Sequence, residues 1–376
     1  MSGRTSTRGR LAALLAVFTA FAAVPVAAQT SYRAYVASES EDEVAVVRFT
    51  PGVGLDVEKR IPVGRWPAEI EGPHGVYFDP SGDYWYLTLG HGIPTGVLLK
   101  YDAAADTVVG FAELGLFPAT VSLTPEGVLA FVVNSNFYGD HVPSTVSVVD
   151  TWDMVEIART ETCTMPHGSR MSPDGTLNYS ACMVDDQLVE MSSQSLQVTR
   201  RLNLATGEPV TAEHAGHDMA SMARVSRASA TPTCSPTWTA PTGDGRLVYV
   251  ACNRGNEILE VDAGDWTVRR RIPAEGAPYN LALTRDGRRI LATLKGSAHL
   301  GVWDLSTGRQ LAKVASLQKV THGVVVTPDD RYALVTVEGV GGQPGIVEVI
   351  DLATYERVAS AEIGKQAGGI ALVPTP

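Results

Sequence analysis

Histidine carries the clearest chemical signal in this sequence. His74, His167 and His322 each stand directly before a glycine, at the start of a segment predicted to be a β-strand. Neutral imidazole is the commonest side-chain ligand for zinc, copper, iron and nickel in proteins. If the fold brings these three side chains together, they form a candidate transition-metal site.

A second group of candidate ligands lies in residues 212–222. Two imidazoles and two thioethers fall within nine residues there, namely His214, His217, Met219 and Met222. Thioether sulfur is a soft ligand that magnesium and calcium sites do not use, whereas Cu(I) accepts both Met and His. The composition therefore favours copper. A surface loop whose His and Met residues bind nothing explains the pattern equally well, because an H-x-x-H pair alone is a weak signal.

The elements that must position these residues form a repeat. Aligning the chain on the residue at the entry to each repeated strand gives seven positions: His74, Ala119, His167, Thr237, Tyr279, His322 and Gly368. Successive positions are 42 to 48 residues apart, except for one interval of 70 residues. This period is typical of the four-stranded blade of a β-propeller. We expect an all-β, seven-bladed propeller with an insertion at about residues 205–233.

The two ends of the chain are predicted to share one blade. The last repeat offers only a first strand, at residues 368–373. The start of the chain offers the second, third and fourth strands of a blade, at residues 32–37, 43–49 and 57–63. Pairing them would close the ring and remove open sheet edges. We therefore expect one domain over residues 29–376.

Two second-strand segments carry a family resemblance. The segment 247–253 reads LVYVACN and the segment 331–336 reads RYALVT, and both resemble the YVTN family of β-propeller repeats. The resemblance covers essentially all of residues 29–376. More distantly, the chain is similar to the propellers that carry the d1 haem of cytochrome cd1 and the copper centre of nitrous oxide reductase. Because propellers host many unrelated functions, the resemblance implies a fold more than an activity.

The repeat register assigns all eight histidines to one face. First strands line the central channel of a propeller, so His74, His167 and His322 would form a ring at its mouth. They belong to the first, third and sixth blades, so a shared metal site requires a narrow channel. Further candidate residues on this face are His91, His141 and His299, in loops between second and third strands, together with Tyr279, Thr237, Arg254 and Lys295. The alternative is that long polar loops simply gather at this face.

The four cysteines occupy matching positions in two successive repeats. Cys163 and Cys182 fall in one repeat, and Cys234 and Cys252 in the next. Antiparallel first and second strands would place each pair across a ladder, within disulfide reach. We expect two disulfides, each within one blade; thiolate ligation of a metal is the alternative.

The N-terminus indicates export. Residues 1–28 combine three arginines, an apolar segment at 11–24 and small residues at the end, as in a secretory signal peptide. Its removal takes three of 30 basic residues and none of 41 acidic ones, which changes the net charge from −11 to −14. Nucleic acid and anionic membranes are therefore disfavoured as partners. No later segment is long and apolar enough to span a membrane, so we expect a periplasmic or secreted protein.

Three functions fit these observations, in decreasing order. The first is a propeller that binds a transition metal at its His-rich face, with copper favoured, for carriage or redox chemistry. The sequence does not exclude a d1-type haem, in place of a bare metal ion, at the channel mouth. The second is a metal-free periplasmic scaffold that holds a protein or a small ligand. The third is a lactonase-like hydrolase, although no carboxylate pair can be assigned to it. The sequence does not decide whether the protein is an enzyme.

Overall fold

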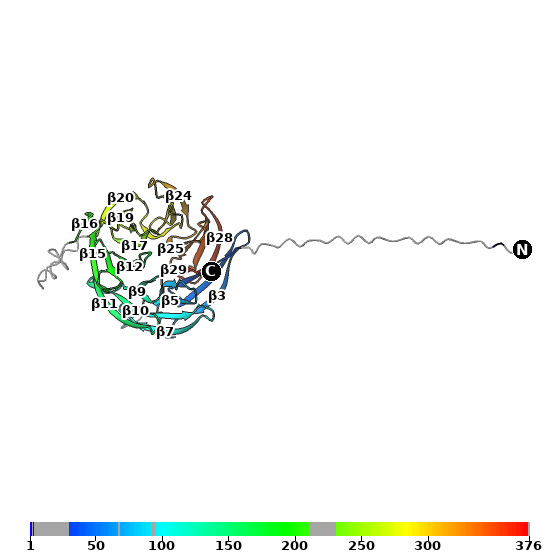
Figure 1. The fold of residues 1–376 in the computed structure, drawn as a ribbon, viewed down its shortest axis with the longest axis horizontal. Helices are drawn as coiled ribbons and strands as arrows, with labels where there is room; N and C mark the ends of the chain where they lie inside the picture. Colours follow the sequence, from blue (N-terminus) through cyan, green and yellow to red (C-terminus); the bar gives the residue numbers. More distant parts are fainter. Residues whose placement is uncertain (2, 4–29, 67, 92–94, 211–230, 375–376) are drawn as a thin grey trace.

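The computed structural model describes residues 30–66, 68–91, 95–210 and 231–374, together with residues 1 and 3. The strands in this part of the chain form seven separate antiparallel sheets arranged in a ring (Figure 1). This confirms the predicted seven-bladed β-propeller. The predicted signal peptide lies outside the described residues apart from residues 1 and 3.

Each sheet is one blade, with four strands that run from the channel to the rim. The first strands are β4 (Pro73–Phe78), β8 (Pro118–Leu123), β12 (Pro166–Met171), β17 (Pro236–Pro241), β21 (Pro278–Leu283), β25 (Val320–Val326) and β29 (Ala367–Leu372). The second are β5 (Tyr84–Leu89), β9 (Leu129–Asn134), β13 (Leu177–Cys182), β18 (Leu247–Cys252), β22 (Arg289–Leu294), β26 (Tyr332–Glu338) and β1 (Tyr32–Ser38). The third are β6 (Val97–Asp102), β10 (Pro143–Asp150), β14 (Gln187–Ser192), β19 (Glu257–Asp262), β23 (His299–Asp304), β27 (Gly345–Asp351) and β2 (Glu43–Thr50). The fourth are β7 (Thr107–Glu113), β11 (Val155–Thr164), β15 (Val198–Asn203), β20 (Thr267–Pro273), β24 (Gln310–Ala315), β28 (Glu356–Ile363) and β3 (Gly54–Pro62), and β16 (Glu208–Pro209) adds a short fifth strand beside β15.

The chain ends close the ring as predicted. Strand β29 pairs antiparallel with β1, with Ala34 opposite Leu372 and Val36 opposite Ile370, and the sheet continues through β2 to β3. The first strands contact one another around the whole channel, including β29 with β4. The ring therefore depends on both ends of the chain.

Burial follows the position of a strand in its blade. Inner strands are buried on both faces, and large side chains such as Trp85 and Trp303 are fully buried between blades. Outer strands alternate exposed and partly buried residues, as in β28. This pattern is what apolar burial between stacked sheets and a solvated rim require.

Both predicted disulfides are present, but one of them joins two blades. Cys163 lies near the end of β11, the fourth strand of one blade, and bonds Cys182 at the end of β13 in the next. The prediction that this bond lies within a blade was wrong. Strand β11 continues past Cys163 to Thr164, so Cys163 belongs to the blade before the one that β12 begins. The Cys234–Cys252 bond lies within one blade, as predicted, and fastens the chain that enters β17.

Candidate functional site

Bulges in the first strands place the predicted ring histidines, His74, His167 and His322. The pairing with the second strand shifts register between Pro73 and Val76, and equivalent shifts occur in β12 and β25. A bulge turns a side chain away from the regular alternation of a strand. The repeated irregularity is therefore the feature that points the ring histidines to the channel mouth.

The glycine after each ring histidine is required by close packing. A Cβ atom on Gly75 would lie 2.6 Å from the carbonyl oxygen of Ala119, and one on Gly323 would lie 2.8 Å from that of Gly368. Gly168 faces the carbonyl of Thr237 in the same way. The His-Gly pairs thus reflect contact between neighbouring blades.

Threonine hydroxyls of the second strands join first strands of neighbouring blades by hydrogen bonds. The Thr336 hydroxyl accepts a hydrogen bond from the Gly323 amide at 2.7 Å and donates one to the Gly368 carbonyl at 2.7 Å. Thr293 makes the equivalent bridge from the Asn280 amide to the carbonyl of His322. These bridges fix each ring position relative to the next blade.

The three imidazoles converge, so the channel is as narrow as a shared site requires. The ring centroid of His74 lies 5.5 Å from that of His167 and 5.7 Å from that of His322. All three residues are at most 5% exposed. The ring of Tyr279 lies beside two of the imidazoles, with centroid distances of 5.4 Å to His167 and 4.8 Å to His322. The structure therefore brings the three imidazoles together at the channel mouth, the condition that a shared site requires.

Hydrogen bonds determine which nitrogen of each imidazole is available. Nδ1 of His74 donates to the carbonyl of Ala119 at 2.9 Å, and Nδ1 of His167 donates to the carbonyl of Thr237 at 3.3 Å. In the neutral rings Nε2 is therefore the unprotonated nitrogen. The Tyr279 hydroxyl donates to Nε2 of His167 at 3.0 Å.

His322 has a different set of contacts. Its Nδ1 is buried without a hydrogen-bond partner of normal geometry in the described part of the chain. Its Nε2 lies 3.8 Å from Oε1 of Glu338. The carbonyl of Gly368 nevertheless lies close enough to this ring to oppose the lowering of its pKa, in the place that the carbonyls of Ala119 and Thr237 take beside the other two rings.

Burial keeps the ring histidines neutral. It lowers the pKa of His167 to about 3, with further lowering by His74 and Lys295. Burial also lowers the pKa of His74, although Glu39 opposes this, and it lowers the pKa of His322 well below the usual value. All three imidazoles are therefore in the form that binds metal ions at neutral pH.

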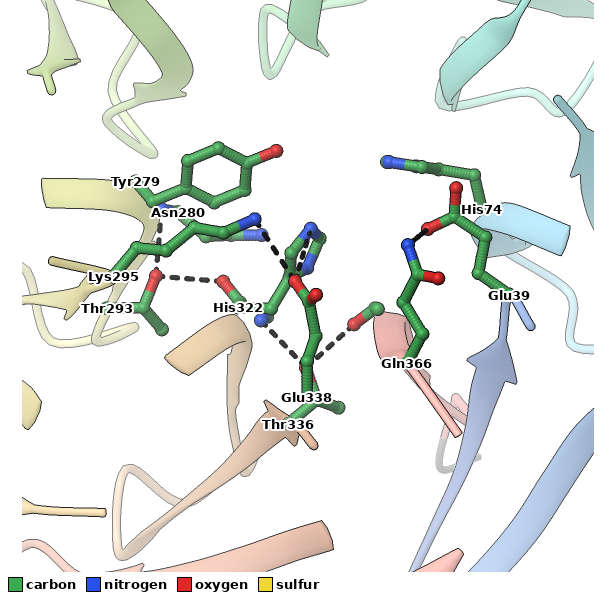
Figure 2. A network of polar contacts seen from close by, with 12 residues as sticks. Glu39, His74, Tyr279, Asn280, Thr293, Lys295, His322, Thr336, Glu338 and Gln366 are labelled. Atoms are coloured by element: carbon green, nitrogen blue, oxygen red, sulfur yellow. Dashed lines mark hydrogen bonds and ion pairs between the residues drawn. The ribbon is translucent and has the colours of Figure 1, made fainter. Parts of the chain in front are cut away.

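Charged side chains surround the rim of the site (Figure 2). Lys295 Nζ lies 3.1 Å from Oε1 of Glu338 and 4.3 Å from the ring centroid of Tyr279. On the opposite side, Glu39 accepts hydrogen bonds from His91 at 2.7 Å and from Gln366 at 2.8 Å. Burial alone would raise the pKa of Glu39, but the bond with His91 and nearby positive charge lower it overall. The rim thus carries two carboxylates held by basic or amide groups.

These residues line a hollow at the channel mouth, which we call the mouth hollow. It encloses about 340 Å³ of empty space, part of it open to solvent. Phe117, Phe137 and Tyr138 form an aromatic wall of this hollow, and Phe117 and Tyr138 contact the ring of His91. The site can therefore hold either an ion or a small molecule with an apolar part.

The other predicted site residues have varied positions. Lys295 and Tyr279 line the mouth hollow, and His91 reaches it through Glu39. His141 and Arg254 are exposed in loops. The predicted insertion ligands His214, His217, Met219 and Met222 lie outside the described residues.

Two expectations for this face need correction. His299 was expected in a loop, but it is the first residue of strand β23, and its Nδ1 is bonded to the carbonyl of Ser297 at 2.6 Å. The hydroxyl of Thr237 donates to the Tyr279 carbonyl at 2.7 Å, so it joins two neighbouring first strands and is not available to a ligand. Neither side chain lines the mouth hollow.

Sequence reasoning missed Glu39, Gln366 and the aromatic wall. Glu39 directly follows its second strand β1, just as Lys295 directly follows β22. The repeat alignment could have identified Glu39 by this shared position. Phe117 directly precedes its first strand, as Gln366 does, so the same alignment could have identified both, whereas Phe137 and Tyr138 lie in the loop between β9 and β10.

The three imidazoles do not form a preformed metal site. Among the described residues, no group of three or more His, Cys, Asp or Glu side chains is arranged to hold a metal ion. The hydroxyl of Tyr279 occupies Nε2 of His167. Metal binding, copper and d1-type haem therefore stay predictions.

Comparisons with known proteins define the fold and no more. No protein-family model matches the sequence, so the YVTN resemblance stays a prediction, and no curated protein matches it. One similar solved structure is hydrazine synthase of Kuenenia stuttgartiensis, with a TM-score of 0.63 and 16% identity over 84% of this chain and 99% of that chain. At this identity the likeness shows a shared propeller architecture. In the described residues no helix is long and apolar enough to cross a membrane.

Proposed function

We propose that the channel mouth binds a transition metal ion through the neutral imidazoles of His74, His167 and His322, with copper favoured. The observation that carries this proposal is the anchoring of Nδ1 in His74 and His167 on backbone carbonyls. Metal-binding histidines typically donate their other ring N–H in this way, which fixes the ring and its tautomer. The buried His322 supplies a third candidate donor through Nε2, which lies 3.8 Å from Oε1 of Glu338.

The electrostatics of the site support a cation. Glu39 and Glu338 place two carboxylates around the imidazoles, and the lowered pKa values keep the rings unprotonated. Metal binding at neutral pH therefore displaces no proton from these rings. Binding at Nε2 of His167 requires the Tyr279 hydroxyl to leave that nitrogen.

Copper in such a site would supply one-electron redox chemistry or would be cargo. The chain's own contribution is to hold the three rings in a buried channel mouth. The insertion, with His214, His217, Met219 and Met222, is proposed as a lid or a second copper site. Two disulfides are consistent with an exported protein, so we place this activity in the periplasm or outside the cell.

Metal analysis tests the proposal. Protein purified from a periplasmic extract without chelator should contain stoichiometric copper, and a variant with all three ring histidines replaced by Ala should lose it. The exposed His141→Ala variant is the matched control and should keep the wild-type content. Unchanged copper in the triple variant would contradict the proposal.

The aromatic wall favours a second candidate, a metal-free binding scaffold. Phe117, Phe137 and Tyr138 contact one another in tilted and edge-to-face arrangements in the wall of the mouth hollow, which Lys295 also lines. Such a surface suits a small ligand that has an apolar body and an anionic end. Tight small-ligand binding by metal-free protein, lost on Phe137→Ala and kept by the triple His variant, would favour this function.

A further inference from the structure

We propose that the central channel holds a second site, which binds a small planar oxyanion of about the size of formate through Arg170. The site is a cavity in the channel, lined by first-strand residues that include Arg170, Trp238 and Asn280. His74 and His322 line both this channel cavity and the mouth hollow. The imidazoles therefore lie between the two sites.

Arg170 is a cation without a counter-charge. Its only hydrogen bond within the described residues runs from Nη1 to the carbonyl of Ser169 at 2.8 Å, and its guanidinium lies 4.8 Å from the ring centroid of Trp238. No carboxylate of the described chain forms an ion pair with it. A guanidinium has five N–H donors, so most of its hydrogen-bonding capacity is unused.

The partial burial of Arg170 makes the missing anion significant. Burial lowers its pKa, and the residue as a whole keeps intermediate exposure, as expected at the wall of a cavity. A desolvated charge is costly unless an opposite charge compensates for it. Stacking on Trp238 offsets only part of this cost.

The fold itself does not require an arginine at this place. The residue three positions after the ring position is uncharged in the other six blades: Tyr77, Ser122, Ala240, Ala282, Val325 and Ala371. At this repeat position a positive charge thus occurs in one blade only. We attribute it to binding.

Two further polar groups in the channel cavity have no partner in the part of the chain that the structure describes. Nε1 of Trp238 and Oδ1 of Asn280 are buried without hydrogen bonds, in residues that are 4% and 5% exposed. The side-chain amide nitrogen of Asn280 also donates no hydrogen bond to the described residues. Since the two ends of an amide are interchangeable by rotation, Asn280 can present donors to an anion.

Size and shape select the ligand. The space open to the centre of a water molecule is about 20 Å³, little more than one water needs, so only the smallest oxyanions are candidates. The planar guanidinium fork matches two oxygens of a carboxylate or similar oxyanion. Water would satisfy the donors but leave the charge uncompensated.

Calorimetric titration of the full chain with formate tests the site, with chelator present to exclude metal. Wild-type protein should bind formate, and Arg170→Met should weaken binding by roughly tenfold or more, since a charge-assisted bidentate contact is lost. Arg288→Met removes a charge from a side chain that is 82% exposed and is the matched control; it should bind like wild type. Absence of formate binding by wild type, or equal binding by Arg170→Met, would overturn the proposal.

A second measurement covers the case in which Arg170→Met does not fold. Crystals of wild-type protein grown with formate should show it bound to the guanidinium of Arg170. Ordered water alone at that position would overturn the proposal. Because neither measurement involves a metal, the outcome is independent of the copper proposal.

Discussion

The ring histidines combine burial with neutrality, and this has a consequence for stability. A His whose pKa is lowered on folding binds fewer protons in the folded than in the unfolded state, so the free energy of unfolding falls as pH drops below the ordinary His value. For His167 the effect extends down to its folded pKa of about 3. The contribution is present in full at neutral pH and is lost on acidification.

Urea unfolding of metal-free protein tests this between about pH 7 and about pH 5. Each buried His should contribute up to about 1.4 kcal/mol of lost stability per pH unit once the unfolded state is protonated. His167→Phe, which cannot titrate, should reduce this slope, whereas exposed His141→Phe should leave it unchanged. A slope unaffected by His167→Phe would show that the imidazole is not buried and neutral.

Tyr279 competes with a metal for Nε2 of His167. Tyr279→Phe removes the hydroxyl, so the hydrogen bond no longer has to be broken on binding. A net hydrogen bond contributes about 0.5–1.5 kcal/mol, so copper affinity should rise by about two- to tenfold. Competition titration with a copper chelator measures the change. A fall in affinity would contradict this account and would make the phenol itself part of the site.

At the scale of elements, the repeat register could be predicted from sequence because each first strand begins with a recognisable entry and a fixed period. The ring positions and both cysteine pairs followed from it. The blade boundary near Cys163 did not, because only Met165 separates β11 from β12. The rim residues Glu39 and Gln366 come from loops at the chain-closing blade, where the repeat is split between the two ends.

The threonine bridges between strands should matter for stability. Thr336→Val keeps the side-chain shape but leaves the Gly323 amide and the Gly368 carbonyl without their partner. Burying two unpaired groups should lower the free energy of unfolding by about 1–3 kcal/mol or more. Exposed Thr107→Val, on β7, is the control and should change it little. Equal stability of both variants in urea unfolding would contradict the bridging role.

At the scale of the whole molecule, closure of the ring by β29 and β1 determines stability. Deleting residues 367–376 removes β29 and exposes the inner edge of β1. A domain is stable by only about 5–15 kcal/mol, so this loss should abolish cooperative unfolding or lower the melting temperature strongly. Deleting residues 375–376 alone leaves β29 intact and is the control. A melting temperature equal to that of the control would contradict closure.

The central claim is that the propeller brings three neutral imidazoles together to bind copper. Electron paramagnetic resonance of the full chain loaded with Cu(II) tests it most directly, because nitrogen couplings identify bound imidazoles. His214 and His217 are replaced by Ala throughout, so that the proposed second site contributes no imidazole. In this background the account predicts imidazole couplings with and without His141→Ala, and their loss when His74, His167 and His322 are all replaced by Ala as well. The same imidazole couplings in the triple variant would contradict it.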